Sequence, residues 1–177
     1  MIRLPRTLRL DLSDTLIFPA AAAPGEWAVP GGFCFWDDDE SLSGKRRQAF
    51  RAGFLGLASF GWATLVEVAE ASPAEREAAL AALAEHIRTS HGAPDETAAR
   101  GAAGEEIAFA GSLCADHPPG TVLALERRFE GGEVRETFRT LHRREVPHSN
   151  FGALPVFTIA RGEDEAPEQP DLTRLRP

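Results

Sequence analysis

The chain has 177 residues, of which 43% are hydrophobic and 26% are charged, and these values indicate a folded globular domain rather than a disordered chain. Its formal net charge of −8 and its pI near 5.2 argue against nucleic-acid binding through a general basic field. No apolar run approaches the ~20 residues that a membrane helix needs, and the N-terminus lacks the apolar run of a signal peptide. Cys34 and Cys114 lie far apart with no disulfide framework, so we expect a cytoplasmic protein without membrane contact.

The N-terminal part of the chain predicts short strands joined by turns. Leucines alternate with other residues over Thr7–Leu12, which is the pattern of a half-buried strand, and Leu16–Phe18 is expected to continue extended. One or two helical turns are predicted around Phe50 and Phe54, which are four residues apart and would share a helix face. A further strand is predicted at Trp62–Ala71.

Two helices are predicted next, at about 73–91 and 96–114. Ser72 and Glu75 have the spacing of a capping box, and Asp95 is placed to cap the second helix. The second helix is rich in Ala and Gly, so its intrinsic stability is low and it depends on packing. Because small side chains let a neighbouring backbone approach closely, a homodimer formed through this helix is one expectation for the oligomeric state.

The stretch 121–144 predicts a β-hairpin with the two-residue turn Gly131-Gly132. With that turn, Leu125 faces Phe138 and Glu130 faces Glu133. Side chains alternate between faces, so the hairpin has one apolar and one charged face. The apolar face comprises Leu123, Leu125, Phe129, Val134 and Phe138, with Arg127 and Glu136 among them. The charged face comprises Glu126, Arg128, Glu130, Glu133, Arg135, Arg139 and Arg143.

The charged face supplies the candidate partner-binding residues. Exposed ion pairs contribute about 0–1 kcal/mol each, so a solvated surface without function is the simpler interpretation. Arg139 and Arg143, however, lack acidic neighbours in the predicted register, and a guanidinium suits planar carboxylates. The predicted docking surface for an acidic segment of a protein partner consists of Arg128, Arg135, Arg139 and Arg143.

The pair Arg127 and Glu136 leaves two interpretations open. The pair is either buried and functional, or it lies at a hairpin tip that projects beyond the core and needs no function.

Familiar catalytic and metal-binding motifs are not matched. The segment GLASFG at 56–61 spaces its first glycine one residue too far from the serine for a nucleophile elbow, so it predicts an ordinary turn. Cys114 and His117 have a C-x-x-H spacing without a second pair, and the acidic run 37–40 lacks a calcium-loop pattern. We expect no catalytic residue, no metal site and no cofactor.

These elements predict an α+β fold with a mainly antiparallel sheet, a pair of helices packed on it and a C-terminal hairpin. Residues 1–161 are expected to form a single domain, with a last strand within Leu154–Ala160. The polar, Pro-rich residues 162–177 are expected to form a flexible tail.

Three blocks of the sequence carry a resemblance to a known family. They are LPRTLRLDLSDTLIF at 4–18, GKRRQAFRAGFLGLASFGWATLVEV at 44–68 and HPPGTVLALERRF at 117–129. The chain resembles a family of small bacterial proteins whose domain has no known function. The resemblance implies an accessory role beside molybdenum-dependent oxidoreductases, and it carries no catalytic residues with it.

The function expected from the sequence is that of a non-catalytic accessory or protein-interaction protein, assisting the assembly or function of a redox enzyme. The alternative is a small-ligand-binding protein or enzyme whose pocket lies between the helical pair and the sheet at Trp62–Ala71. A deep cavity lined by Trp27, Trp36 or Trp62 with converging polar groups would favour that alternative.

Overall fold

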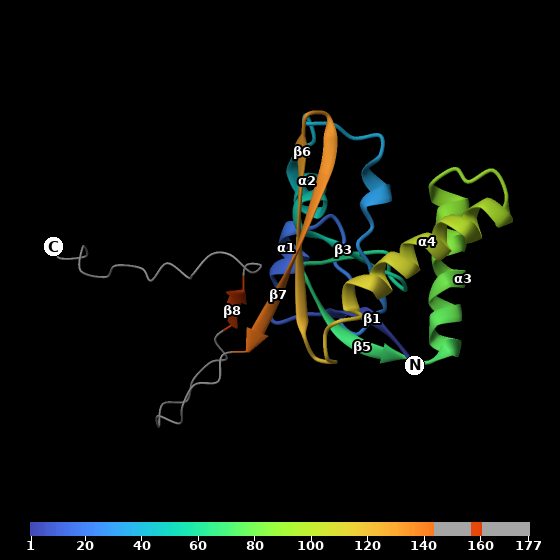
Figure 1. The fold of residues 1–177 in the computed structure, drawn as a ribbon. Coiled ribbons are helices and arrows are strands. Elements are labelled where there is room, and N and C mark those ends of the chain that lie inside the picture. Colours follow the sequence, from blue (N-terminus) through green and yellow to red (C-terminus); the bar gives the residue numbers. More distant parts are fainter. Residues whose placement is uncertain (144–156, 161–177) are drawn as a thin grey trace, which may run out of the picture.

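The computed structural model describes residues 1–143 and 157–160 and has the α+β architecture expected from the sequence (Figure 1). Its larger sheet has five antiparallel strands in the order β1-β5-β6-β7-β8. The strands are β1 (Ile2–Leu8), β5 (Leu65–Ala71), β6 (Val122–Glu130), β7 (Glu133–Arg143) and β8 (Phe157–Ala160). A smaller antiparallel sheet consists of β2 (Ala28–Val29), β3 (Phe54–Gly56) and β4 (Trp62–Ala63).

The first strand begins five residues earlier than the alternating leucines predict. It pairs with β5 from Ile2 opposite Ala71 to Leu8 opposite Leu65. Leu10 and Leu12 lie beyond the last pair and are exposed, so the prediction of a strand at Thr7–Leu12 is wrong from Arg9 onward. The ladder with β5, which a single sequence does not reveal, decides where this strand lies.

The prediction of an extended segment at Leu16–Phe18 is also wrong, because Ser13–Ile17 forms the short helix α1. Asp11 Oδ1 accepts a hydrogen bond from the Ser13 backbone N–H at 2.8 Å, which favours helix entry. Asp14 is buried and accepts from the Thr64 hydroxyl at 2.6 Å, which fixes α1 against the start of β5. The turn that Asp11 makes with Ser13 and one tertiary bond therefore override the apolar run.

Helix α2 (Gly44–Ala52) ends before Phe54, so the two phenylalanines do not share a helix face as predicted. Phe50 is buried on α2, whereas Phe54 begins β3. Gly53 lies between them in an extended conformation, and a Cβ there would come within 2.8 Å of the Trp62 ring. Close packing on Trp62 therefore requires glycine where the helix ends.

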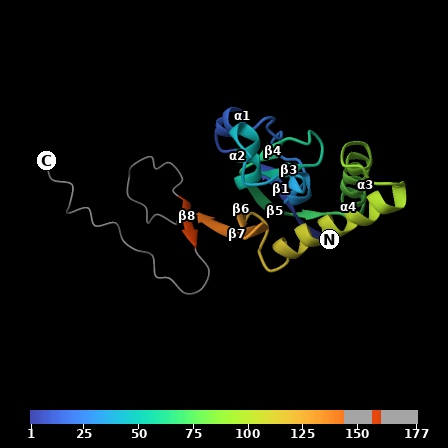
Figure 2. The same cartoon turned by 90° about the horizontal axis from the view of Figure 1, so that it is seen from above.

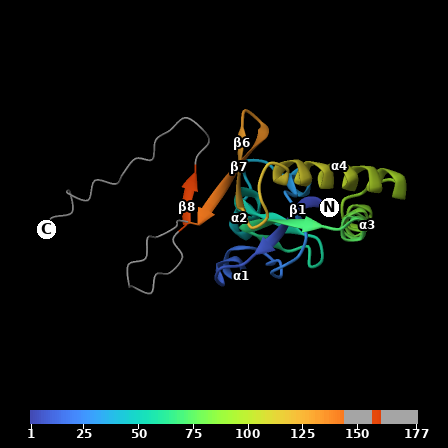
Figure 3. The ribbon, with the colours of Figure 1, turned by 60° about the horizontal axis from the view of Figure 1, so that its bottom comes forward.

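The helical pair and its caps agree with the sequence prediction. Helix α3 (Pro73–Ser90) starts with a complete capping box between Ser72 and Glu75, and helix α4 (Glu96–Cys114) is capped by Asp95, whose side chain accepts from the Ala98 N–H at 2.7 Å. The buried residues of α4 are Ala99, Ala103, Ile107, Ala110 and Cys114. Seen from above and from below, α4 lies on one side of the β1–β5 strands while α1 and α2 lie on the other side (Figures 2 and 3).

The hairpin forms in the predicted register, from Glu130 opposite Glu133 to Val122 opposite Leu141. Gly131 and Gly132 have φ values of +60° and +82°, which is the left-handed pair that a tight hairpin turn requires. Only 122–124 of β6 pair with β5, so the rest of the hairpin extends past the sheet, where α2 packs along β6 (Figure 1).

The predicted flexible tail at 162–177 falls outside the described residues. The last strand predicted within Leu154–Ala160 is present as β8. Among the residues that the structure describes, no helix is both long and apolar enough to cross a bilayer.

Candidate functional site

Arg127 is the centre of the region where the hairpin meets the rest of the fold. Its side chain is fully buried, so of the two interpretations left open the pair with Glu136 is not at a solvated tip. Arg127 Nε donates to Glu136 Oε1 at 2.9 Å, and Nη1 donates to the carbonyls of Phe50 and Gly53 at 3.1 and 3.0 Å. Nη2 donates to the carbonyl of Pro30. One side chain therefore joins the hairpin to the end of α2 and to the loop before η1.

The loop that Arg127 holds leads into the 3-10 helix η1 (Gly32–Phe35). Gly31 has a φ of +76°, and its N–H donates to Glu106 Oε1 on α4 at 2.8 Å. A Cβ at Gly32 would collide with the Glu136 carboxylate, so glycine allows η1 to approach β7 closely. These contacts place η1 between the hairpin and the helical pair, where the light-blue segment runs in Figure 1.

A hollow of about 370 Å³ lies where α4, η1 and β7 meet. Its rim exposes three large apolar side chains: Trp36 is 85% exposed, Phe109 is 41% exposed and Val134 is 43% exposed. The residues that line it are Gly32, Phe33, Trp36, Glu106, Phe109, Val134 and Glu136, and we call it the Trp36 hollow.

Two carboxylates, Glu106 and Glu136, lie in the lining of the Trp36 hollow. Burial raises the pKa of Glu106, and the negative charge of Glu136 adds to that shift. Burial lowers the pKa of Arg127, while Glu136 acts in the opposite direction and favours its charged form. The other side chains in this lining are aromatic or aliphatic, so the two carboxylates are its only ionisable groups among the described residues.

In the predicted docking surface of the hairpin, more of the arginine charge is neutralised by carboxylates than the sequence suggests. Arg139 Nη2 lies 2.7 Å from Glu126 Oε2, so the expectation that Arg139 lacks an acidic neighbour is wrong. The two residues are diagonal across the hairpin, and the long arginine side chain spans that offset. Arg128 and Arg135 both approach Glu130, at 3.1 and 3.9 Å.

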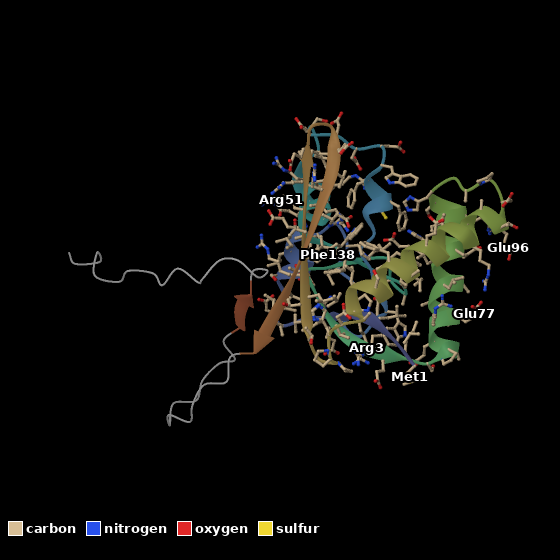
Figure 4. The ribbon with its side chains drawn as sticks, in the orientation of Figure 1. Met1, Arg3, Arg51, Glu77, Glu96 and Phe138 are labelled. Carbon is tan, nitrogen blue, oxygen red and sulfur yellow. The ribbon has the colours of Figure 1, made fainter. Side chains whose placement is uncertain are left out.

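Arg143 belongs to β7, and its side chain lies outside the described part of the chain. Helix α2 adds Arg47 and Arg51, which were not among the predicted residues and which line a second hollow of about 370 Å³ with Arg128. Arg51 lies beside the hairpin, on the opposite side of the molecule from Glu77 and Glu96 of the helical pair (Figure 4). We call Arg47, Arg51, Arg128 and Arg135 the arginine surface.

The metal-ligand residue types and the GLASFG turn are the other candidates from the sequence. Over residues 1–143 and 157–160, no three His, Cys, Asp or Glu side chains are grouped as metal ligands would be. The His86 ring stacks on Phe60 with centroids 3.9 Å apart, and burial lowers the pKa of this histidine. The GLASFG turn is bound by Glu26 from another segment: the N–H groups of Ala58 and Ser59 both donate to Glu26 Oε2 at 2.9 Å.

The Trp36 hollow was not predicted from the sequence, although part of its signal was present. Val134 and Glu136 were placed on the inward face of the hairpin, and Glu106 and Phe109 are three residues apart, hence on one face of α4. Trp36 was named as a possible cavity residue, but the hollow that it lines lies between α4, η1 and β7 and not between the helical pair and Trp62–Ala71.

The fold defines the class of this chain as a small α+β protein, with an antiparallel sheet, a helical pair and a projecting hairpin. The chain belongs to the family described as "Family of unknown function (DUF6505)", whose model matches residues 1–154. No curated protein and no solved structure matches it.

Proposed function

We propose that this is a non-catalytic accessory protein that docks a partner protein through the Trp36 hollow. The observation that carries the proposal is the grouping of Trp36, Phe109 and Val134 as exposed apolar side chains around one hollow. Single exposed apolar residues are ordinary on a protein surface, whereas a contiguous patch with a polar edge is typical of an interaction site. Aromatic residues in particular are enriched at the centres of protein interfaces.

The partner that we propose is a molybdenum-dependent oxidoreductase in the bacterial cytoplasm. The sequence blocks at 4–18, 44–68 and 117–129 support this part of the proposal through the resemblance that they carry. Cys34 and Cys114, which form no disulfide, are compatible with a reducing compartment. The accessory role then consists of assisting the assembly or the function of that enzyme.

The test is affinity capture from the native cell with the intact chain and with Trp36→Ala. Loss of one specific partner from the Trp36→Ala sample is the expected result, because truncation removes the most exposed aromatic of the rim. Leu16→Ala is the matched control, since Leu16 is a 71% exposed apolar residue on α1. An unchanged set of partners with Trp36→Ala, or an equal loss with Leu16→Ala, would contradict the proposal.

A second candidate is the docking of an acidic partner segment on the arginine surface. The observation that favours it is the hollow that Arg47, Arg51 and Arg128 share at the free side of β6. The predicted set Arg128, Arg135, Arg139 and Arg143 is best tested through Arg128→Glu/Arg135→Glu, because these two arginines share the one carboxylate of Glu130, whereas Arg139 has Glu126 to itself. This variant is expected to lose the partner more strongly at low ionic strength, and retention of the partner would remove this candidate.

A further inference from the structure

We infer that the Trp36 hollow recognises a basic side chain, an arginine guanidinium in preference to a lysine ammonium, presented by a segment of the partner. The inference rests on the proposed docking function and adds the chemistry of the group that enters the hollow. Three features of the hollow support it: the charges that a ligand can reach, the hydrogen bonds that each carboxylate makes through only one of its oxygens, and the apolar rim.

The charges that a ligand can reach in the hollow are negative. Arg127 is a cation behind the lining, but its side chain has an exposed fraction of 0% and its donors are engaged by Glu136 and three backbone carbonyls. Glu136 retains an exposed fraction of 22%, and Glu106 is half-buried. An anionic group would meet two carboxylates here, whereas a cation would relieve their mutual repulsion.

Each carboxylate makes its hydrogen bonds within the fold through one oxygen alone. Glu106 Oε1 accepts from the Gly31 N–H, and Glu136 Oε1 accepts from Arg127. Neither Oε2 atom has a hydrogen-bond partner among the described residues, and neither is a fully buried orphan. The bond to Gly31 needs only one acceptor, and the negative charge of Glu106 also interacts favourably with the buried Arg127.

The rim suits the rest of an arginine side chain. Trp36 offers an aromatic face, on which a guanidinium can stack, and Phe109 and Val134 can cover its aliphatic stem. A planar guanidinium has five N–H donors and can address two carboxylates at once, which a compact ammonium does less well. The combination therefore favours arginine over lysine and excludes an acidic segment from this hollow.

Glu106→Gln separates recognition from folding. The glutamine carboxamide oxygen can still accept from the Gly31 N–H, so the variant is expected to keep the loop in place while removing the charge. Glu105→Gln is the matched control, because Glu105 is an exposed neighbour on α4 that does not line the hollow. Unchanged circular dichroism of both variants shows that the fold is kept.

The experiment titrates the purified chain with N-acetyl-arginine methylamide and follows the Trp36 indole and the Gly31 and Gly32 amide signals by NMR. The uncharged isostere N-acetyl-citrulline methylamide and the lysine analogue are titrated in parallel. We expect saturable shifts with the arginine probe, binding at least about tenfold weaker for citrulline and for Glu106→Gln, and no change for Glu105→Gln, one tenfold step being about 1.4 kcal/mol. Raising the ionic strength is expected to weaken the binding of the arginine probe, because salt screens the attraction between opposite charges.

The inference is overturned if the arginine and citrulline probes bind with equal affinity, or if Glu106→Gln binds the arginine probe as tightly as the parent chain does. It is also overturned if no probe binds. If Trp36→Ala loses its partner while citrulline binds as well as arginine, docking stands and the cation inference fails. If the arginine probe binds through Glu106 while capture is unchanged by Trp36→Ala, the hollow is a cation site and the docking proposal fails.

Discussion

Replacing Arg127 by methionine is expected to destabilise the protein by about 3–5 kcal/mol, the magnitude for removing one partner of a buried ion pair. The structure indicates where that free energy resides. The substitution leaves the carbonyls of Pro30, Phe50 and Gly53 without their donor, and each unsatisfied buried group costs about 1–3 kcal/mol when water does not replace the donor. Glu136, by contrast, is partly exposed and can be solvated when Arg127 is lost.

The hydrogen bonds to the three carbonyls should therefore contribute more to the free energy of unfolding than the ion pair does. Glu136→Gln keeps an acceptor for Arg127 Nε, leaves the carbonyl bonds intact and retains Glu106 as a nearby negative charge, so we expect it to cost less, about 1.5–3 kcal/mol, the range for a hydrogen bond to a charged group. Arg128→Met is the matched control for Arg127→Met, because Arg128 is the exposed neighbour on the opposite face of β6, and its effect should stay within about 0.5 kcal/mol.

Urea unfolding followed by circular dichroism measures these free energies. A loss of about 3–5 kcal/mol is a large part of the ~5–15 kcal/mol that stabilises a typical domain, so Arg127→Met is measured at low temperature and from low denaturant upward. The reasoning is refuted if Arg127→Met costs less than about 1 kcal/mol, since the carbonyls then find other partners easily. It is also refuted if Glu136→Gln costs as much as Arg127→Met, since the ion pair would then dominate.

Three further predictions concern single residues. Ser72→Ala should lower the free energy of urea unfolding by about 1 kcal/mol through loss of the capping box, with Ser90→Ala as the exposed control; equal effects would contradict a capping role. Because burial raises the pKa of Glu106 above its ordinary value of 4.5, its stabilising contribution is present below that pH and is lost as the pH rises through the folded-state pKa. Glu106→Gln should therefore gain stability relative to the parent as the pH rises above 4.5, and a constant difference in urea unfolding would exclude the shift. Burial raises the pKa of Cys34 and of Cys114 to about 12, so alkylation by iodoacetamide at about pH 8 should be roughly 10³-fold slower in the folded than in the urea-unfolded chain, and equal rates would be the contrary result.

The elements that the sequence predicted correctly are those whose signals are local. The Gly131-Gly132 turn sets the hairpin register by itself, and the caps at Ser72 and Asp95 lie within three residues of the groups that they bind. The errors arise where a distant partner decides the outcome. The start of β1 is set by its ladder with β5, and the end of α2 is set by close packing on Trp62.

The candidate site was less predictable than the fold because it is assembled from three separate segments. Trp36, Phe109 and Val134 are each unremarkable in sequence, and only the tertiary structure places them around one hollow. The exposed arginines were easier to notice because they are contiguous in one hairpin, yet Glu126 neutralises Arg139 in the folded chain. Residue type and alternation predict which face a side chain occupies, but not which charges remain available there.

Burial of Arg127 links the core to the Trp36 hollow. The same guanidinium that binds the carbonyls of the Pro30 loop and of α2 also binds Glu136, which lines the hollow. The position of η1 beside β7 depends on that arrangement together with the contact from Glu106 to Gly31. A buried ion pair as a whole is weak support for stability, since apolar residues in place of both partners often stabilise as much. Its consequence here is specificity of placement, because an apolar residue at 127 would fill the same space without orienting Glu136 or fixing the loop that brings Trp36 to the rim.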